Sequence, residues 1–396
     1  MPLLGSYLLF FCAAVLTLVA GWDINNVKDR QKCQALTKNP LDGCDSSPGR
    51  TLYVNAAGKK SHFKSVQSAV ESLPDNTETY TILIAPGKYT EQVNVTRPGP
   101  TYLLGQTSHP LSQASNTVTL VWEASASPGI DNAFTSTLTI APNLNASLTG
   151  AGPTGFPERE DNPFGCVDFR TYNLDVVNDA PDNGVPSLAL GISYANGGFY
   201  YTGFYSYQDT IYVGKLGNAY IAKSEIAGKT GTRADFLYGF GTCWITDSAL
   251  RLRSCGGGIA AWKGTNTTAF ENKYGVYVVD SDVRAASSSL NIKGKCALGR
   301  PWNTEQRAIF ANTYLDDSIL STGFIDWKPS RYDSHRTLQA EYKNYGPGYD
   351  AQGRSKAQFG VQLTEEQWAE YSSPQKVFQT REGKFGNVDW IDSGFE

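Results

Sequence analysis

The sequence is poor in charge and in histidine, and both shortages exclude classes of protein. Charged residues make up 18% of the 396 residues, the net charge is −4, and no run of Lys and Arg occurs. A nucleic-acid-binding protein normally carries a basic footprint, so no nucleic-acid partner is expected. The low charge and the lack of heptads also exclude a coiled coil.

Several catalytic motifs are missing as well. The sequence contains three histidines and no H-E-x-x-H motif, which argues against a zinc hydrolase. It contains no G-x-S-x-G motif, no P-loop, and no G-x-G-x-x-G segment after a strand. Any hydrolytic chemistry in this chain is therefore expected to use carboxylates.

The N-terminus carries a long apolar stretch. Residues 1–20 contain no charged side chain, residues 8–20 are almost wholly apolar, and Ala20 and Gly21 precede the first charge, Asp23. This pattern predicts a secretory signal peptide over residues 1–20, cleaved after Ala20 or Gly21. A membrane anchor is the weaker alternative, because a spanning helix needs about 20 apolar residues. We therefore expect a secreted, extracellular protein with no membrane association after cleavage.

Cysteine usage agrees with secretion. Apart from Cys12 in the predicted signal, six cysteines are present, and the sequence leaves their connectivity open. Cys33 and Cys44 are separated by turn residues, so we expect them to form a clasp within an N-terminal extension over residues 21–49. The other cysteines are candidates for free, buried thiols. Sequons at Asn94, Asn145 and Asn266 would accept glycans in the secretory pathway.

The content of glycine and aromatic residues favours an all-β fold. The chain has 39 Gly, 22 Tyr, 18 Phe and 8 Trp, in short β-branched and aromatic segments separated by Gly, Asn and Asp. Examples of these expected strands are residues 51–54, 80–84, 136–140, 173–177 and 275–279. Helical patterns are confined to residues 63–73 and to the segment after a capping box at Thr364, and residues 21–49 are interpreted as loop. No linker divides residues 50–396, which we treat as one domain.

A loose repeat indicates how the strands are arranged. Apolar residues after a polar doublet recur at Phe204, Ile226 and Ala249, which are 22 and 23 residues apart, and wider-spaced copies occur at Val283 and Leu315. A period in the low twenties is typical of a parallel β-helix, in which each coil buries its inner face against the next. A β-propeller would need blades of about 40–50 residues. A β-sandwich remains an alternative, because two Asn-Gly pairs occur.

Two aspartates have a spacing that suits this repeat. Asp209 and Asp235 are 26 residues apart, which is about one coil plus a small insertion. Neighbouring coils lie about 4.8 Å apart, so the two carboxylates are expected side by side. One of them would then stay protonated, which gives one acid and one base or nucleophile. Arg300, between Gly299 and Pro301 and next to Trp302, suits pairing with a carboxylate. The alternatives are that both aspartates are turn residues and that Arg300 forms a surface ion pair.

These segments resemble the signatures of a known family. In order, YQDT (207–210), DFLYG (235–239) and LGRPW (298–302) are similar to signature segments of the pectin methylesterases. Further similar segments are GKYTE (87–91), GFIDW (323–327), AEY (340–342) and GPG (346–348). The resemblance runs from about residue 50 to residue 348 and is greatest to secreted fungal and microbial members, which lack a large pro-domain. It implies a single-domain right-handed parallel β-helix with short N- and C-terminal helices, in agreement with the repeat.

The resemblance also implies roles for individual residues. Asp235 would be the nucleophile that attacks a methyl ester of homogalacturonan, and Asp209 the acid/base. Arg300 would keep Asp235 ionised, and Gln208 would stabilise the oxyanion. The implied sugar contacts are Tyr207, Phe236, Trp302 and Trp327. The scheme implies neither a metal nor another cofactor, and we expect a monomer whose partner is pectin.

One family feature is missing from the sequence. Family members usually carry a second oxyanion-binding Gln about 22 residues before the Gln of the QDT segment. In this chain that count reaches Pro186, which has no backbone N–H, and Ser187 is its substitute if the register differs by one residue. Losing such a donor can cost about 10²–10³ in rate. The alternatives are therefore a weakened, pectin-binding β-helix and an esterase for another modified polygalacturonate. A β-eliminating lyase is a third alternative.

Overall fold

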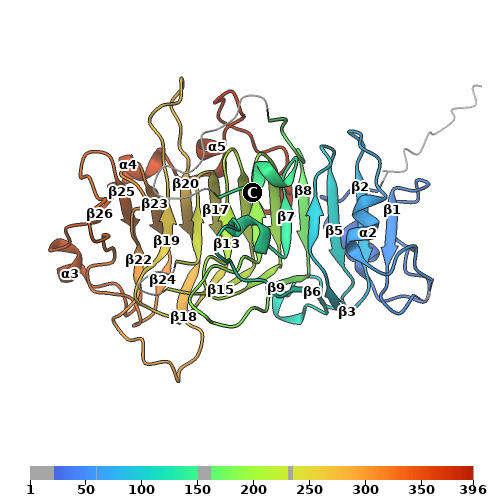
Figure 1. Cartoon of the computed structure of the whole chain (residues 1–396), viewed down its shortest axis with the longest axis horizontal. Coiled ribbons are helices and arrows are strands. Elements are labelled where there is room, and N and C mark those ends of the chain that lie inside the picture. The colour runs from blue at the N-terminus through green and yellow to red at the C-terminus, as the bar shows by residue number, and fades with distance from the viewer. Residues whose placement is uncertain (1–21, 59, 150–161, 231–234, 396) are drawn as a thin grey trace, which may run out of the picture.

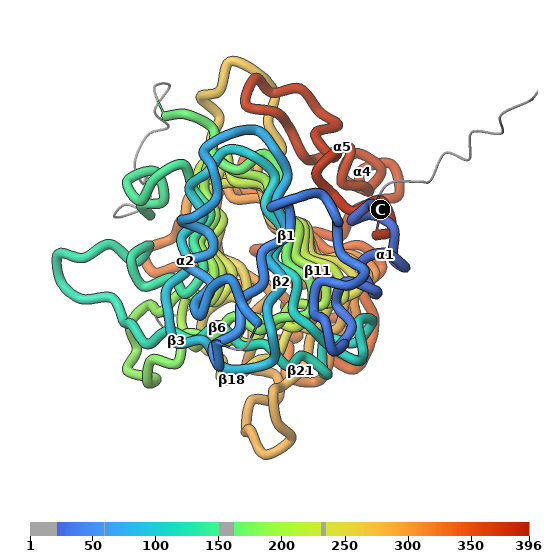
Figure 2. Tube along the Cα trace, turned by 90° about the vertical axis from the view of Figure 1, so that its right-hand side faces the viewer, coloured from blue at the N-terminus to red at the C-terminus, as the bar shows by residue number. Residues whose placement is uncertain are grey.

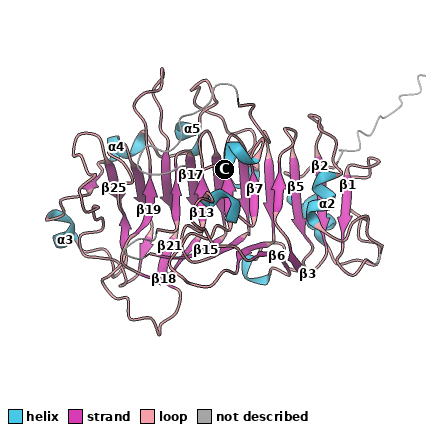
Figure 3. Cartoon of the chain, viewed as in Figure 1, coloured by secondary structure: helices cyan, strands magenta, loops and turns pink. Residues whose placement is uncertain are grey.

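The chain folds into stacked coils of short strands. The computed structural model describes residues 22–58, 60–149, 162–230 and 235–395, so the predicted signal peptide lies outside the described residues. Within these residues the strands form three sheets, and every pairing between named strands is parallel (Figures 1 and 3). No helix among them is both long enough and apolar enough to cross a membrane.

The three sheets contain strands of two to six residues, and hydrogen-bonded neighbours follow one another along each sheet. Sheet A consists of β1 (Thr51–Val54), β2 (Tyr80–Ile84), β5 (Thr101–Gly105), β8 (Phe169–Tyr172), β11 (Asn196–Tyr200), β14 (Asn218–Ala222), β17 (Thr242–Thr246), β20 (Gly275–Val279), β23 (Arg307–Ala311), β25 (Leu338–Tyr342) and β26 (Val361–Gln362). Sheet B consists of β3 (Gly87–Thr90), β6 (Val118–Trp122), β9 (Asp175–Asn178), β12 (Gly203–Tyr205), β15 (Glu225–Lys229), β18 (Ala249–Ser254), β21 (Asp282–Ala285) and β24 (Tyr314–Leu315). Sheet C consists of β4 (Val93–Val95), β7 (Leu138–Ile140), β10 (Leu190–Ile192), β13 (Ile211–Val213), β16 (Leu237–Gly239), β19 (Gly258–Trp262) and β22 (Ala297–Gly299).

Coils in the middle of the molecule contribute one strand to each sheet in turn. One coil passes through β11, β12 and β13 and returns to sheet A at β14, which pairs with β11 from Asn196↔Asn218 to Tyr200↔Ala222. The coils superimpose when the molecule is viewed from its end (Figure 2). The expected parallel β-helix is therefore the fold of this chain, and three expected strands (residues 51–54, 80–84 and 275–279) have the predicted bounds.

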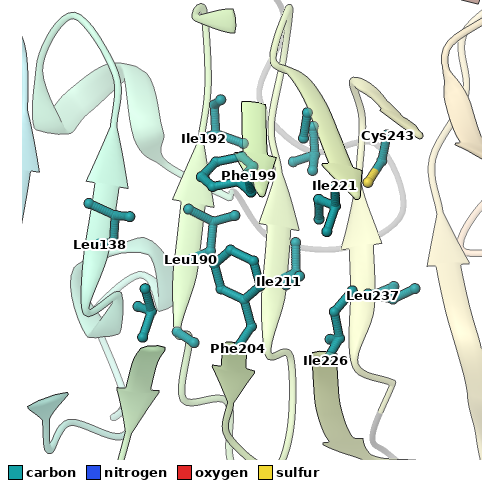
Figure 4. Close-up of a cluster of buried hydrophobic side chains, with 14 of the residues drawn as sticks. Leu138, Leu190, Ile192, Phe199, Phe204, Ile211, Ile221, Ile226, Leu237 and Cys243 are labelled. Atoms are coloured by element: carbon teal, nitrogen blue, oxygen red, sulfur yellow. The ribbon is translucent and has the colours of Figure 1, made fainter. Parts of the chain in front are cut away.

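Columns of apolar side chains fill the inside of the coils. In sheet B the inward column runs through Val176, Phe204, Ile226, Leu250, Val283 and Leu315, all fully buried. Figure 4 shows part of this core, with Phe204 and Ile226 beside Leu190, Ile211 and Leu237 of sheet C. The predicted repeat was wrong at one member: Ala249 pairs with Glu225, and the column continues at Leu250. The spacing is therefore 24 residues at that step.

The turns that follow the sheet A strands from β8 to β25 repeat the same conformation. Each has one residue with a positive φ between 46° and 54°, and these are Asn173, Tyr201, Lys223, Asp247, Asp280, Asn312 and Lys343. The residue after each turn from Lys223 on is Ser, Thr or Asn, and its side chain accepts a hydrogen bond from the backbone N–H of the preceding coil. The N–H of Thr202 donates to Ser224 Oγ at 3.0 Å, and that of Ser224 donates to Ser248 Oγ at 3.1 Å. This hydroxyl ladder continues through Ser281 and Thr313 to Asn344.

Helices cover the end and one side of the coils. The helices are α1 (Val27–Gln34), α2 (Val66–Glu71), α3 (Ala351–Ser355), α4 (Glu365–Ala369) and α5 (Pro374–Val377), with short 3-10 turns η1 (Gln113–Ser115), η2 (Asn132–Thr135), η3 (Leu144–Ser147) and η4 (Ser393–Phe395). The predicted capping box at Thr364 is present. The interpretation of residues 21–49 as loop was wrong, because α1 lies within this segment. The side chain of Asn26 caps the start of α1. Glu91, in the GKYTE segment, accepts the backbone N–H groups of Val66 and Gln67 at the start of α2.

The six cysteines within the described residues form two disulfides and leave two free thiols. Cys33 and Cys44 form the expected N-terminal disulfide, and Cys255 and Cys296 form a second one between neighbouring coils. Cys166 and Cys243 are free and buried. Burial raises the pKa of the Cys166 thiol to about 12, so this thiol stays protonated and unreactive.

The two terminal segments meet on the outer face of sheet A. The C-terminal residues run back along the molecule toward α1 (Figures 1 and 2). Arg30 Nη1 donates to Asp392 Oδ2 at 2.7 Å, and the Tyr172 hydroxyl donates to the same oxygen at 2.8 Å. Arg30 also stacks on the Tyr172 ring at 4.3 Å, and both charged residues are buried. We call Arg30, Tyr172 and Asp392 the terminal clamp.

Removing the Asp392 carboxylate should destabilise the protein strongly. Asp392→Ala leaves the Arg30 guanidinium buried without its partner, and breaking a buried ion pair in this way costs about 3–5 kcal/mol. Asp317→Ala is the matched control, because its partner Lys293 is exposed and such pairs contribute about 0–1 kcal/mol. Urea unfolding followed by tryptophan fluorescence measures both losses. Similar small losses in the two variants would contradict this role of the clamp.

Candidate active site

The two aspartates of the sequence analysis lie in neighbouring coils on the sheet C side. Asp209 is in the turn between β12 and β13, and Asp235 lies two residues before the start of β16. The backbone N–H of Asp209 donates to the Asp235 carbonyl at 2.8 Å, which sets them side by side as the 26-residue spacing predicted. Asp209 has a φ of 61°, in the left-handed region that Asp tolerates better than most residues. Strained backbone of this kind is often found at functional sites.

Arg300 holds Asp235 in a fixed geometry. Its Nε donates to Asp235 Oδ1 at 2.8 Å and its Nη2 donates to Oδ2 at 2.9 Å. The Gly258 N–H donates a third hydrogen bond to Oδ1, also at 2.8 Å. Both charged side chains are buried, with 4% of Arg300 and 6% of Asp235 exposed. A side chain at Gly258 would clash with the backbone of Gly299 and Arg300, so glycine is required for this close packing.

The environments of the two carboxyl groups separate their pKa values. Burial raises the pKa of Asp235, while the Arg300 guanidinium and the Gly258 N–H oppose that rise. Burial and the adjacent Asp235 carboxylate together raise the pKa of Asp209 well above its usual range, and Arg300 opposes this more weakly. Asp235 therefore ionises first, and Asp209 holds a proton next to it. This is one acid beside one nucleophile or base.

Half-buried aromatic rings surround the pair. The Arg300 guanidinium stacks on Trp327 at 3.6 Å, and Trp302 packs against Tyr238 at 5.3 Å. Tyr207 lies under the Arg253 guanidinium at 4.8 Å. Tyr207, Trp302 and Trp327 are thus partly accessible near the carboxylates. Phe236 is a correction: it is fully buried in the core of the coils, because its side chain points inward, and it cannot contact a sugar.

The missing family Gln also needs a correction of register. β10 pairs with β13 from Leu190↔Ile211 to Ile192↔Val213, and the Ser187 N–H donates to the Gln208 carbonyl at 3.0 Å. Ser187, not Pro186, is therefore the neighbour of Gln208, and the step between the coils is 21 residues. The Ser187 hydroxyl bonds the Ser206 hydroxyl at 2.8 Å and is buried.

Two polar residues beside Asp209 were not predicted. Asn132, in η2, donates from Nδ2 to Asp209 Oδ2 at 3.4 Å. The preceding Asp131 fixes this turn, because its Oδ1 accepts the N–H groups of Ala133 and Thr149. The Tyr238 hydroxyl is buried and lies beside Asn132. Burial and then the Asp209 carboxyl raise the pKa of Tyr238, so its hydroxyl remains a donor. No motif marks Asn132, which is 77 residues from Asp209 in sequence.

The described residues contain no group of three or more His, Cys, Asp and Glu side chains that could hold a metal ion. The site is thus built from carboxyl, guanidinium, amide and aromatic groups.

A family model described as Pectinesterase matches residues 165–380, which include Asp209, Asp235 and Arg300. The chain belongs to the pectinesterase family. It is 26% identical to "Probable pectinesterase A" of Aspergillus niger over 348 residues, covering 88% of this chain and 90% of the relative. It is also 26% identical to a pectinesterase of Aspergillus aculeatus, covering 80% of this chain and 87% of the relative.

Solved pectinesterase-family structures share the fold. The Aspergillus niger pectin methylesterase matches with a TM-score of 0.65 and 23% identity, covering 88% of this chain and 99% of that one. The carrot pectin methylesterase matches with a TM-score of 0.65 and 21% identity, covering 84% and 94%. A mutant pectin methylesterase in complex with a hexasaccharide matches with a TM-score of 0.62 and 22% identity, covering 82% and 96%.

Replacing the two aspartates by asparagine should change stability in opposite directions. The pKa of Asp209 is higher in the folded than in the unfolded chain, so its ionisation destabilises the fold as pH rises above the unfolded value. Asp209→Asn should therefore raise stability at pH 7 by about 1 kcal/mol or more, and the gain should vanish at low pH. Asp235→Asn should lower stability, because it leaves Arg300 buried without its carboxylate.

Thermal and urea unfolding of both variants at pH 4 and pH 7 measure these changes. A stability loss in Asp209→Asn comparable to that in Asp235→Asn would contradict the protonated state of Asp209.

Proposed function

We propose that this protein hydrolyses methyl esters of homogalacturonan and releases methanol, as a secreted pectin methylesterase. The observation that carries the proposal is the Asp235–Arg300 pair beside a protonated Asp209 on a pectinesterase fold. Family membership and the printed names of the fungal relatives support the substrate class. The hexasaccharide complex of a related structure supports an extended, oligomeric substrate.

The proposed reaction has two steps, in which Asp235 is first the nucleophile and then the leaving group, and Asp209 is first the acid and then the base. The ionised Asp235 carboxylate attacks the ester carbonyl carbon, and the Asp209 proton passes to the leaving methoxy oxygen, so methanol departs and an acyl-enzyme remains. Water then gives a proton to Asp209 and its hydroxyl to the acyl carbon. This frees the galacturonate and restores Asp235. The net reaction consumes one water for each methanol released.

Amide groups near the pair would stabilise the charge that develops during attack. Gln208 is the proposed oxyanion donor, because it adjoins Asp209 and is only 7% exposed. Ser187 has a short side chain hydrogen-bonded to Ser206, so it is a poor substitute for a second amide. Asn132 is proposed as a positioning residue: its N–H group contacts Asp209 Oδ2, which leaves Oδ1 to carry the transferable proton.

Secretion is part of the same proposal. The apolar residues 1–20 and the two disulfides support it. Of the three sequons, Asn145 and Asn266 are exposed, whereas Asn94 is half-buried in β4. Glycans are therefore proposed at the first two positions.

The deciding experiment compares methanol release from highly methylated pectin by the wild type and Asp235→Ala. We expect release by the wild type and none above background by the variant. Binding to immobilised pectin is measured in parallel, and circular dichroism confirms that the variant is folded. Undetectable release by a folded wild type that still binds pectin would overturn the proposal in favour of a binding protein. Products absorbing in the ultraviolet would instead reveal a lyase.

Asn132→Ala should lower kcat about tenfold, as expected for losing one hydrogen bond to a reacting group. Because an N–H donor favours the ionised carboxylate, its removal should also move the alkaline limb of the kcat–pH profile to higher pH. The control is Asn132→Gln, which keeps an amide and should retain more activity. An unchanged pH profile would show that Asn132 does not act on Asp209.

A further inference from the structure

Arg331 lies beside the catalytic pair and is held in place from several sides. Its Nη1 donates to the Trp302 carbonyl at 3.2 Å, and its guanidinium stacks on Trp327 at 4.6 Å. Its backbone N–H donates to Asp326 Oδ1 at 3.0 Å. Trp327 is therefore in contact with two guanidinium groups, those of Arg300 and Arg331. Arg331 is half-buried, so part of its guanidinium remains accessible.

This arginine forms no ion pair within the described residues, although acidic groups are near. The Asp326 carboxylate instead accepts backbone N–H groups of Trp327 and Arg331 and the hydroxyl of Ser330. The charge of Arg331 does reach Asp235, whose pKa it lowers slightly, but Asp235 is already bonded by Arg300 and Gly258. A partly desolvated guanidinium with fixed geometry and open donors is suited to a carboxylate ligand.

The surroundings of Arg331 are positively charged and aromatic. Lys263 Nζ lies 3.9 Å from the Trp302 ring centre and 4.5 Å from that of Phe240, and Lys215 Nζ lies 5.4 Å from the Phe240 ring. Burial lowers the pKa of Lys263 to about 7, and the charges of Lys215 and Arg331 act in the same direction. Arg331 and Lys215, joined by Lys263 below pH 7, therefore give the Trp302 side of the nucleophile a positive potential that favours an anion.

We propose that Arg331 forms a subsite for the free carboxylate of a galacturonate close, in the same polysaccharide chain, to the methylated sugar that reacts. The inference rests on the proposed function. A methyl ester is neutral and cannot form the paired N–H···O⁻ bonds that a carboxylate makes with guanidinium. The enzyme would thus prefer partly de-esterified pectin. Each turnover creates a carboxylate, so the product of one reaction would fill the subsite for the next.

Arg331→Gln tests the subsite, because glutamine can keep the hydrogen bond to the Trp302 carbonyl but has no charge. On partly de-esterified pectin we expect KM to rise about tenfold with kcat nearly unchanged, as expected for one lost charge-assisted interaction. On fully methylated pectin KM should stay within about twofold. The preference of the wild type for partly de-esterified over fully methylated pectin should also decrease at 1 M salt. Arg336→Gln is the control, because Arg336 is exposed in the same segment and pairs with Glu305.

Binding distinguishes failure of this inference from failure of the proposed function. Calorimetry with a fully de-esterified oligogalacturonide needs no turnover, and we expect binding by the wild type and Arg336→Gln but a loss of about tenfold in Arg331→Gln. Arg331→Lys keeps the charge without the planar donor pair, so its affinity should lie between those of the wild type and Arg331→Gln. Equal binding in wild type and Arg331→Gln would overturn the subsite whether or not methanol is released.

Two kinetic results would also overturn it. A KM increase of the same size on both pectins would assign Arg331 to general packing of Trp327. A shifted acid limb of the kcat–pH profile with unchanged KM would assign it to the ionisation of Asp235. Thermal unfolding of each variant verifies that the folded protein is compared.

Discussion

Parallel backbone hydrogen bonds hold each coil about 4.8 Å from the next, and the rest of this structure depends on that spacing. It brings residues that are 21 to 68 positions apart into contact, and it repeats the same environment from coil to coil. The hydroxyl ladder from Ser224 to Asn344 keeps successive coils aligned where the chain turns from sheet A to sheet B. Apolar columns fill the inside. The outer faces are then available for chemistry, as on sheet C, or for covering segments, as on sheet A.

Much of the fold could be predicted because a stacked coil imposes a short-range pattern. Strands β1, β2 and β20 have the predicted bounds, and Phe204 and Ile226 are true neighbours. The errors arose where turn length varies. A difference of one residue moved the repeat from Ala249 to Leu250, and moved the neighbour of Gln208 from Pro186 to Ser187. Since side chains alternate between faces, a shift of one residue exchanges inside for outside. The polar residue after each left-handed turn from Tyr201 on would have been a better marker of the period.

The site was predictable to the extent that its members adjoin one another along the coils. The spacing of Asp209 and Asp235 predicts that they lie close together. The pairing of Arg300 with Asp235, which is bidentate in the structure, was expected from a motif. Asn132 reaches Asp209 from a 3-10 turn in a preceding part of the chain, and Arg331 reaches Trp302 from a loop, so no regular spacing reports either contact. Phe236 shows the opposite case: a residue inside the DFLYG motif fills the core, next to Asp235 on the outer face.

The terminal clamp changes how this stack of coils can come apart. A solenoid whose coils contact only their neighbours can peel from either end. In this chain Arg30 and Asp392, 362 residues apart, close the chain into a loop across the outer face of sheet A. Neither end can peel until the clamp opens, which joins the two ends into one cooperative unit. During synthesis the coils can stack in order as they emerge, but the Arg30 guanidinium of α1 lacks its carboxylate partner until Asp392 has been made.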